Sequence, residues 1–98
     1  MQLNLDQHQL AEICQKHQAD YLGVFGSFSR GDTVEDSDID FLVRFSPSSH
    51  AGLFELSRMR DDLEKFTGKK VDLLTEGFLS KYFKDEVLSE VKDIYVKA

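Results

Sequence analysis

The 98-residue sequence predicts an α+β domain built from four helical stretches and three or four strands. Residues 39–45 are apolar at every second position, which is the period of a half-buried strand. Two longer stretches, 51–66 and 79–91, instead carry apolar residues at intervals of three and four, as amphipathic helices do. The sequence contains no internal repeat and no low-complexity segment, so we expect a single domain over residues 1–98.

The first half of the chain is predicted to contain a helix followed by two strands. Residues 6–17 form the helix, and Cys14, one turn beyond Leu10, is expected to be buried on its apolar side. Residues 21–25 form a short apolar run typical of a buried strand. A short helical turn is expected after Ser27. The strand 39–45 follows a loop over 32–37, and solvation of the loop explains its acidic residues as well as a functional role does.

The second half begins with a loop over 46–50, where the only proline and three serines interrupt both periodicities. Gly68 is expected to end the next helix, and a strand over 70–75 and a closing strand over 94–96 flank the last helix. The predicted apolar stripe of the helix over 51–66 consists of Leu53, Leu56, Met59, Leu63 and Phe66. That of the helix over 79–91 consists of Leu79, Tyr82, Phe83, Val87, Leu88 and Val91.

The composition restricts the compartment and the partners. Twelve Lys and Arg against eighteen Asp and Glu leave a net charge of −6, which opposes stable nucleic-acid binding and favours a basic protein partner. The single cysteine excludes a disulfide within the chain. The sequence has no apolar run of about 18 residues and no signal-peptide pattern at its start, so we expect a cytoplasmic protein that does not enter membranes.

Histidines and tyrosines carry no visible catalytic pattern. The three histidines have no metal-ligand spacing, and we expect all of them at the surface: His8, His17 and His50. The three tyrosines lie on buried-looking faces or near the chain ends, where packing is the usual explanation: Tyr21, Tyr82 and Tyr95.

Two carboxylates are predicted to project together from the start of the strand 39–45. Because side chains alternate along a strand, Asp38 and Asp40 share the face opposite to Ile39. Neighbouring negative charges repel each other unless a cation lies between them, and hard oxygen ligands suit Mg²⁺ or Mn²⁺. Asp72 interrupts the apolar strand 70–75 and is a candidate third ligand, although a solvent-facing edge position also explains it.

Gly26 and Ser27 form a turn directly after the strand 21–25. Glycine allows a ligand to approach the backbone closely, and free N–H groups at a following helical turn bind phosphate oxygens. Arg30 adds a charged donor nearby. A plain turn is the simpler explanation of Gly26 and Ser27 taken alone, and only their combination with the acidic residues indicates a phosphate site.

A calcium-binding loop is the competing motif, because Asp36, Asp38 and Asp40 match its first three ligand positions. That loop requires glycine at its sixth position and a bidentate glutamate at its twelfth, where this chain has Phe41 and Pro47. The calcium interpretation is therefore excluded.

Three segments resemble the minimal nucleotidyltransferase family of the DNA polymerase β superfamily: 26–32, 37–43 and 71–75. The similarity extends to residues 62–70 and 90–96, so it covers nearly the whole chain. The resemblance implies the polymerase β-like nucleotidyltransferase fold, with a small mixed β-sheet flanked by helices. It also implies that Gly26 and Ser27 hold a nucleoside triphosphate and that three carboxylates bind Mg²⁺ or Mn²⁺: Asp38, Asp40 and Asp72.

Small members of this family resemble antitoxins whose partner is an all-helical HEPN toxin, and which transfer AMP from ATP to a tyrosine of that toxin. The resemblance implies this activity for the chain, with ATP as substrate. Two alternatives remain open: an antitoxin that masks its partner by stoichiometric binding, and nucleotidyl transfer to a small molecule or an RNA end. The acceptor, the base preference and the choice between homo-oligomer and hetero-oligomer are not fixed by the sequence.

Overall fold

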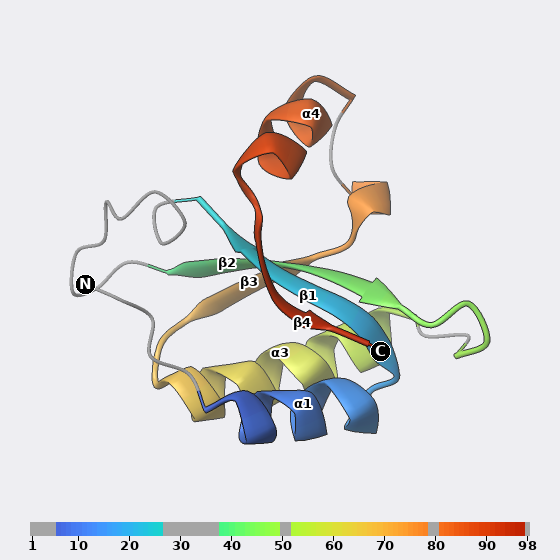
Figure 1. Cartoon of the computed structure of the whole chain (residues 1–98), viewed down its shortest axis with the longest axis vertical. Helices are drawn as coiled ribbons and strands as arrows, with labels where there is room; N and C mark the ends of the chain where they lie inside the picture. Colours follow the sequence, from blue (N-terminus) through green and yellow to red (C-terminus); the bar gives the residue numbers. More distant parts are fainter. Residues whose placement is uncertain (1–5, 27–37, 50–51, 79–80, 98) are drawn as a thin grey trace.

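The computed structural model describes residues 6–26, 38–49, 52–78 and 81–97, and the side chains of 78 and 81–83 are not described. The described residues form a four-stranded mixed sheet, three α-helices and one short 3₁₀-helix (Figure 1). In chain order the elements are α1 (Gln7–Lys16), β1 (Ala19–Phe25), β2 (Ile39–Phe45), α3 (Leu53–Thr67), β3 (Val71–Leu74), η1 (Glu76–Phe78), α4 (Lys81–Glu90) and β4 (Lys92–Val96). The predicted α+β class with a mixed sheet flanked by helices is confirmed.

The strands are ordered β3-β2-β1-β4 in the sheet. β1 pairs antiparallel with both β2 and β4, whereas β2 and β3 run parallel. Parallel neighbours cannot be joined by a tight turn, and α3 supplies the crossover between them. The closing strand is confirmed and is longer than predicted, since it begins at Lys92.

Local signals in the sequence set two of the helix ends. The side chain of Asp6 accepts hydrogen bonds from the N–H groups of His8 (2.9 Å) and Gln9 (3.1 Å), which is the N-cap interaction that begins α1. Gly68 has a φ of 72° and donates its N–H to the carbonyl of Glu64 at 2.8 Å. Glycine takes this left-handed conformation without a Cβ clash, and Gly68 ends α3 as predicted.

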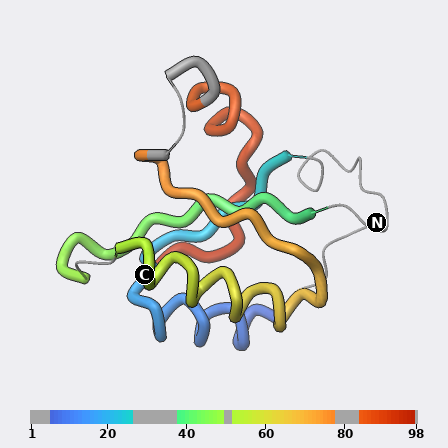
Figure 2. Tube along the Cα trace, turned by 180° about the vertical axis from the view of Figure 1, so that it is seen from behind, coloured from blue at the N-terminus to red at the C-terminus, as the bar shows by residue number. Residues whose placement is uncertain are grey.

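Helices α1 and α3 cover one face of the sheet (Figures 1 and 2). Leu10 and Cys14 of α1 and Met59 and Leu63 of α3 are fully buried against the strands in one continuous core. Burial raises the pKa of the Cys14 thiol to about 12, so this thiol stays protonated and inert. The predicted burial of Cys14 is confirmed.

Helix α4 lies on the other side of the sheet, at the top of Figure 1. The core on this side is small and consists of Phe25, Leu42 and Val87, with Tyr21, Leu74 and Val91 packed around it. α4 therefore covers this face over a limited apolar area, whereas α1 and α3 close the opposite face.

Two residues of the predicted apolar stripes do not reach the core. Leu53, the first residue of α3, is 68% exposed, because the buried side of that helix begins a turn later at Leu56. Leu88 is 39% exposed, since the adjacent Val87 faces the sheet. The other predicted stripe residues Leu79, Tyr82 and Phe83 lie outside the described side chains, as does the helical turn expected after Ser27. None of the helices in the described ranges is long and apolar enough to cross a bilayer.

Candidate active site

The parallel pair β2–β3 places two of the predicted carboxylates side by side. Asp40 is the register partner of Asp72, and Ile39 is that of Val71. Ile39 and Val71 are buried in the core under α1 and α3, so alternation directs Asp40 and Asp72 to the opposite face. Two carboxylates from segments far apart in the sequence therefore meet on the face that α4 only partly covers.

The predicted phosphate turn begins against one of these carboxylates. Phe25 pairs with Asp40 across β1 and β2, and Gly26 follows with a φ of 73°. A Cβ added to Gly26 would collide with the carboxylate of Asp40. Glycine is thus required at this position for two reasons, the left-handed backbone and the closeness of the Asp40 side chain.

The remaining predicted site residues are placed less completely. Asp38 is exposed and lies directly before β2, two residues before Asp40 and hence on the same side of the strand. Ser27 and Arg30 lie outside the described residues. The structure therefore brings Gly26, Asp40 and Asp72 together at one end of the sheet, with Asp38 beside them.

The donor chemistry of this site suits a hard cation such as Mg²⁺. Within the described ranges, no group of three or more His, Cys, Asp or Glu side chains is arranged to hold a metal ion by itself. Mg²⁺ is normally bound by one or two carboxylates together with substrate phosphates and waters. The in-register pair of Asp40 and Asp72 fits that incomplete protein ligand set.

Polar contacts join β1, β2, β4 and η1 at the far end of the same face. The hydroxyl of Tyr21 donates to Asp93 at 2.6 Å, and burial together with this hydrogen bond raises the pKa of Tyr21. Arg44 lies over the Tyr21 ring, 5.3 Å from its centroid, and donates to Glu76 at 2.6 Å. The hydrogen bond from Arg44 lowers the pKa of Glu76, so Arg44 and Glu76 are both charged and form an ion pair.

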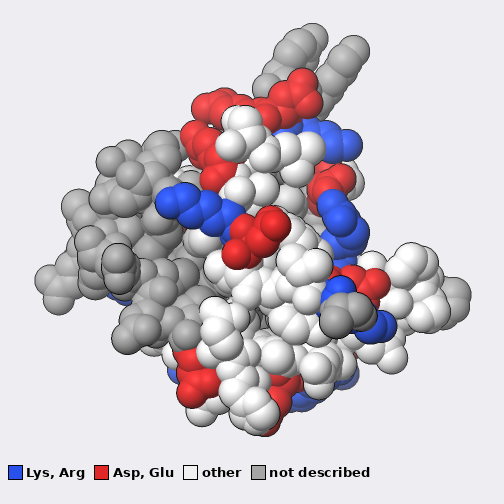
Figure 3. Space-filling model, viewed as in Figure 1, with Lys and Arg blue, Asp and Glu red and all other residues white. Residues whose placement is uncertain are grey.

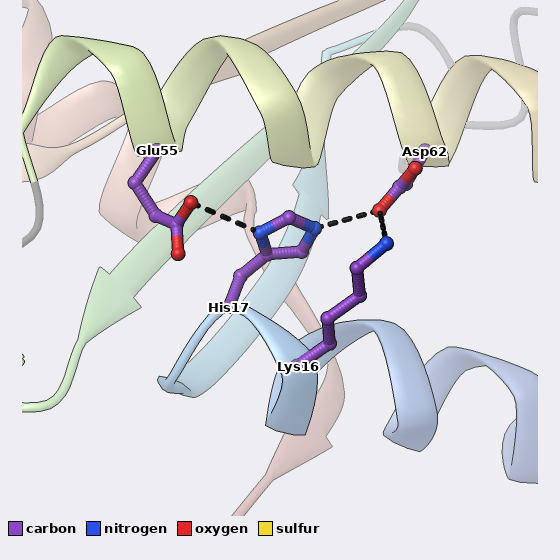
Figure 4. A network of polar contacts seen from close by, with 4 residues as sticks. All are labelled: Lys16, His17, Glu55 and Asp62. Atoms are coloured by element: carbon purple, nitrogen blue, oxygen red, sulfur yellow. Dashed lines mark hydrogen bonds and ion pairs between the residues drawn. The ribbon is translucent and has the colours of Figure 1, made fainter.

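His17 is buried, and the prediction that it lies at the surface is wrong. It is 3% exposed at the end of α1 and lies between two carboxylates of α3 (Figure 4). Its Nε2 is 2.7 Å from Asp62 Oδ2, and its Nδ1, which has no hydrogen bond among the described residues, is 3.4 Å from Glu55 Oε2. Lys16 Nζ also contacts Asp62 at 3.1 Å.

The sequence contained a signal for the burial of His17. Leu10, Cys14 and His17 follow the helical spacing of four and three residues, which places them on one side of α1. The hydrogen bond to His17 lowers the pKa of Asp62, so the carboxylate is ionised and pairs with the imidazole. This network lies on the face opposite to Asp40 and Asp72, and it joins α1 to α3 rather than contributing to the candidate site.

Comparison with known protein families identifies the kind of domain. The family model described as "Nucleotidyltransferase domain" matches residues 8–94. A candidate protein adenylyltransferase from Methanocaldococcus jannaschii is 35% identical over 94 residues, covering 96% of this chain and 99% of the relative. The protein adenylyltransferase MntA of Thermococcus cleftensis is 40% identical over 77 residues, covering 76% of this chain and 72% of the relative.

Solved structures agree with this comparison. A structure described as a minimal nucleotidyltransferase has a TM-score of 0.75 at 34% identity, and the match covers 88% of this chain and 86% of the chain in that structure. A toxin–antitoxin crystal structure with AMP-PNP has a TM-score of 0.76 at 19% identity, with 95% of this chain and 75% of that chain covered. At that level of identity the second likeness establishes the fold alone.

Proposed function

Because this chain belongs to the nucleotidyltransferase domain family, we propose that it is a protein adenylyltransferase that transfers AMP from ATP to a hydroxyl of a partner protein. The observation that carries this proposal is the register pairing of Asp40 with Asp72, with the Gly26 turn against Asp40. Nucleotidyl transfer needs carboxylates at the reacting phosphate and a close backbone approach to the phosphate chain. The relatives named protein adenylyltransferases support the protein acceptor.

Each predicted residue has a role in this proposal. Asp40 and Asp72, with Asp38 beside them, would hold Mg²⁺ or Mn²⁺ together with the substrate phosphates, while Gly26 and Ser27 would seat the β- and γ-phosphates and Arg30 would add a charged donor. A bound divalent ion supplies electrostatic stabilisation of phosphoryl charge and lowers the pKa of the acceptor hydroxyl. The acceptor oxygen forms a bond to the α-phosphorus, the bond from the α-phosphorus to the bridging oxygen breaks, pyrophosphate leaves with that oxygen, and the acceptor proton passes to solvent.

A HEPN-type toxin is the partner that we propose, and a tyrosine is the acceptor. One structural neighbour is a tri-AMPylated HEPN toxin of Shewanella oneidensis in complex with an MNT antitoxin. Acidic side chains gather over α4 on the face seen in Figure 3, and a surface of this charge favours a basic partner. The chain would then act as an antitoxin in the cytoplasm, where its free cysteine stays reduced.

Masking by stoichiometric binding is the second candidate, because the neighbouring toxin–antitoxin structures include complexes of the two proteins. Intact-mass spectrometry separates the two candidates. The purified chain is incubated with the protein encoded next to it, ATP and Mg²⁺, and the mass of each protein is followed. Transfer adds one or more AMP masses to the partner and requires the metal, whereas a tight complex whose partner keeps its mass with all four nucleotides contradicts transfer and supports masking.

A further inference from the structure

A lysine occupies the sheet position directly beyond the carboxylate pair. The backbone carbonyl of Lys70 accepts a hydrogen bond of 2.9 Å from the N–H of Ile39, so the pairing of β2 with β3 continues to this residue. Since Ile39 pairs with Val71 and Asp40 with Asp72, Lys70 lies next to Asp38, the residue directly before β2. Lys70 is two residues before Asp72, and alternation places it on the same face of the sheet.

The ammonium of Lys70 is available for a ligand. Lys70 is exposed, and no hydrogen bond or ion pair of its side chain to another described residue is present. The other described cations on this face are engaged elsewhere, because Arg44 donates to Glu76 at 2.6 Å and Lys84 lies 3.9 Å from the same glutamate. Lys70 is therefore a described cation at the carboxylate end of the face that is not held by a neighbouring acid.

The order of the three strands indicates which phosphate of a bound nucleotide lies nearest to Lys70. Gly26 follows β1, Asp40 lies on β2, and Asp72 and Lys70 belong to the β3 side. If the β- and γ-phosphates lie at Gly26, the phosphate farthest from that turn is the α-phosphate, next to β3. Lys70 is about 7 Å from Asp72 along the chain, a span that its flexible four-carbon side chain can bridge.

We propose that Lys70 binds the α-phosphate of the nucleotide, at the opposite end of the phosphate chain from Gly26. This inference rests on the proposed function in taking a nucleoside triphosphate as the ligand. An ammonium at this position offsets negative charge that the three nearby carboxylates would otherwise repel, and it orients the phosphoryl group that is transferred. Lys70 is thus a substrate-binding residue supplied by the parallel pairing of β2 with β3.

The test is the affinity for an ATP analogue with a methylene group between the α- and β-phosphates, measured by calorimetry with Mg²⁺, because this analogue cannot be turned over. Lys70→Met should weaken its binding by about tenfold or more, since a charge-assisted hydrogen bond is lost. Lys70→Arg should restore binding to within about threefold. Lys65→Met, at an exposed lysine of α3, is the matched control and should bind like wild type.

A second ligand locates the contact. Pyrophosphate lacks the α-phosphate, so Lys70→Met should bind it within about twofold of wild type. Unchanged affinity of Lys70→Met for the analogue overturns the inference, and an equal loss for pyrophosphate overturns the assignment to the α-phosphate. The binding measurements test the role of Lys70 and do not require nucleotidyl transfer. A wild-type protein that binds the analogue but modifies no partner protein therefore contradicts only the proposed function. Wild type that binds neither ligand contradicts both.

Discussion

One face of the sheet is closed by α1 and α3 over a continuous core, whereas the other is covered by α4 over a small apolar cluster and carries the candidate site. The closed face even buries a polar group, His17, whose Nε2 contacts Asp62 of α3 at 2.7 Å while its Nδ1 has no hydrogen bond among the described residues. The partly open face keeps Asp72 in contact with solvent. This small domain therefore concentrates its stability on one face of the sheet and leaves carboxylates accessible on the other.

Asp72→Asn should give the largest effect and should separate the two faces most clearly. We expect transfer to the partner to fall at least about a thousandfold, because a metal ligand worth several kcal/mol of transition-state stabilisation is lost. The melting temperature should change little, since Asp72 is exposed and outside both apolar clusters. Transfer is measured by intact mass and folding by thermal unfolding. Asp85→Asn, at an exposed residue of α4, makes the same change in charge and is the control. A large drop in melting temperature would contradict the assignment.

Leu63→Ala should destabilise the closed face by about 3 kcal/mol, because a fully buried leucine leaves a cavity in the larger core. Leu42→Ala, the same substitution at a buried leucine of the small cluster under α4, should cost about 2 kcal/mol, since fewer atoms surround the cavity that it leaves. Urea unfolding of both variants measures these free energies. Equal losses would show that the two faces contribute alike to stability, contrary to the comparison.

Asp62→Asn should cost about 2 kcal/mol at pH 7, because it leaves the buried His17 without its closest carboxylate. The pKa of Asp62 is lowered in the folded state, chiefly by the hydrogen bond from His17. Its stabilisation is therefore present above the unfolded pKa of about 3.9 and is lost as the pH falls through the folded value.

Urea unfolding of wild type and Asp62→Asn between pH 7 and pH 3 measures this effect, and the difference between the two proteins should shrink toward the acid end. Asp61→Asn, which removes an exposed carboxylate paired with Arg60 at 3.4 Å, is the neighbouring control and should behave like wild type. A difference that does not depend on pH would exclude ionisation of Asp62 as its cause.

Glu76→Gln should give the smallest effect, about 0.5 kcal/mol, although its contact with Arg44 is as short as that of His17 with Asp62. The side chain of Arg44 is 61% exposed, and solvent screens exposed ion pairs strongly. The same urea measurement at low and high salt tests this point, with a salt-sensitive loss expected. A cost equal to that of Asp62→Asn would mean that the face under α4 is held as firmly as the closed face.

Local patterns predicted the elements and the candidate residues. The alternation over 39–45 predicted β2, and Gly68 predicted the end of α3, because both signals act through backbone conformation nearby in the chain. Asp40 and Asp72 were predicted as ligands, but their pairing depends on the register between β2 and β3, which a sequence pattern does not specify.

Errors arose where partners come from distant elements. His17 was expected at the surface because the histidines show no metal-ligand spacing. Its spacing from Leu10 and Cys14 indicates the buried side of α1, but its two carboxylate neighbours lie on α3, and only the packing of α1 on α3 brings them together. Leu53 was expected in the core because helical spacing predicts which residues share a side, but not where along its length a helix contacts the sheet.

The crossover through α3 also has a kinetic consequence. Asp40 and Asp72 meet only after the whole of α3 has been placed between β2 and β3, and such non-local parallel pairings form slowly compared with helices and hairpins. A partly folded or newly synthesised chain therefore lacks the paired carboxylates, even if β1 and β2 have already formed their hairpin. The appearance of metal-dependent nucleotide binding during refolding would accordingly report completion of the slowest contact in the sheet.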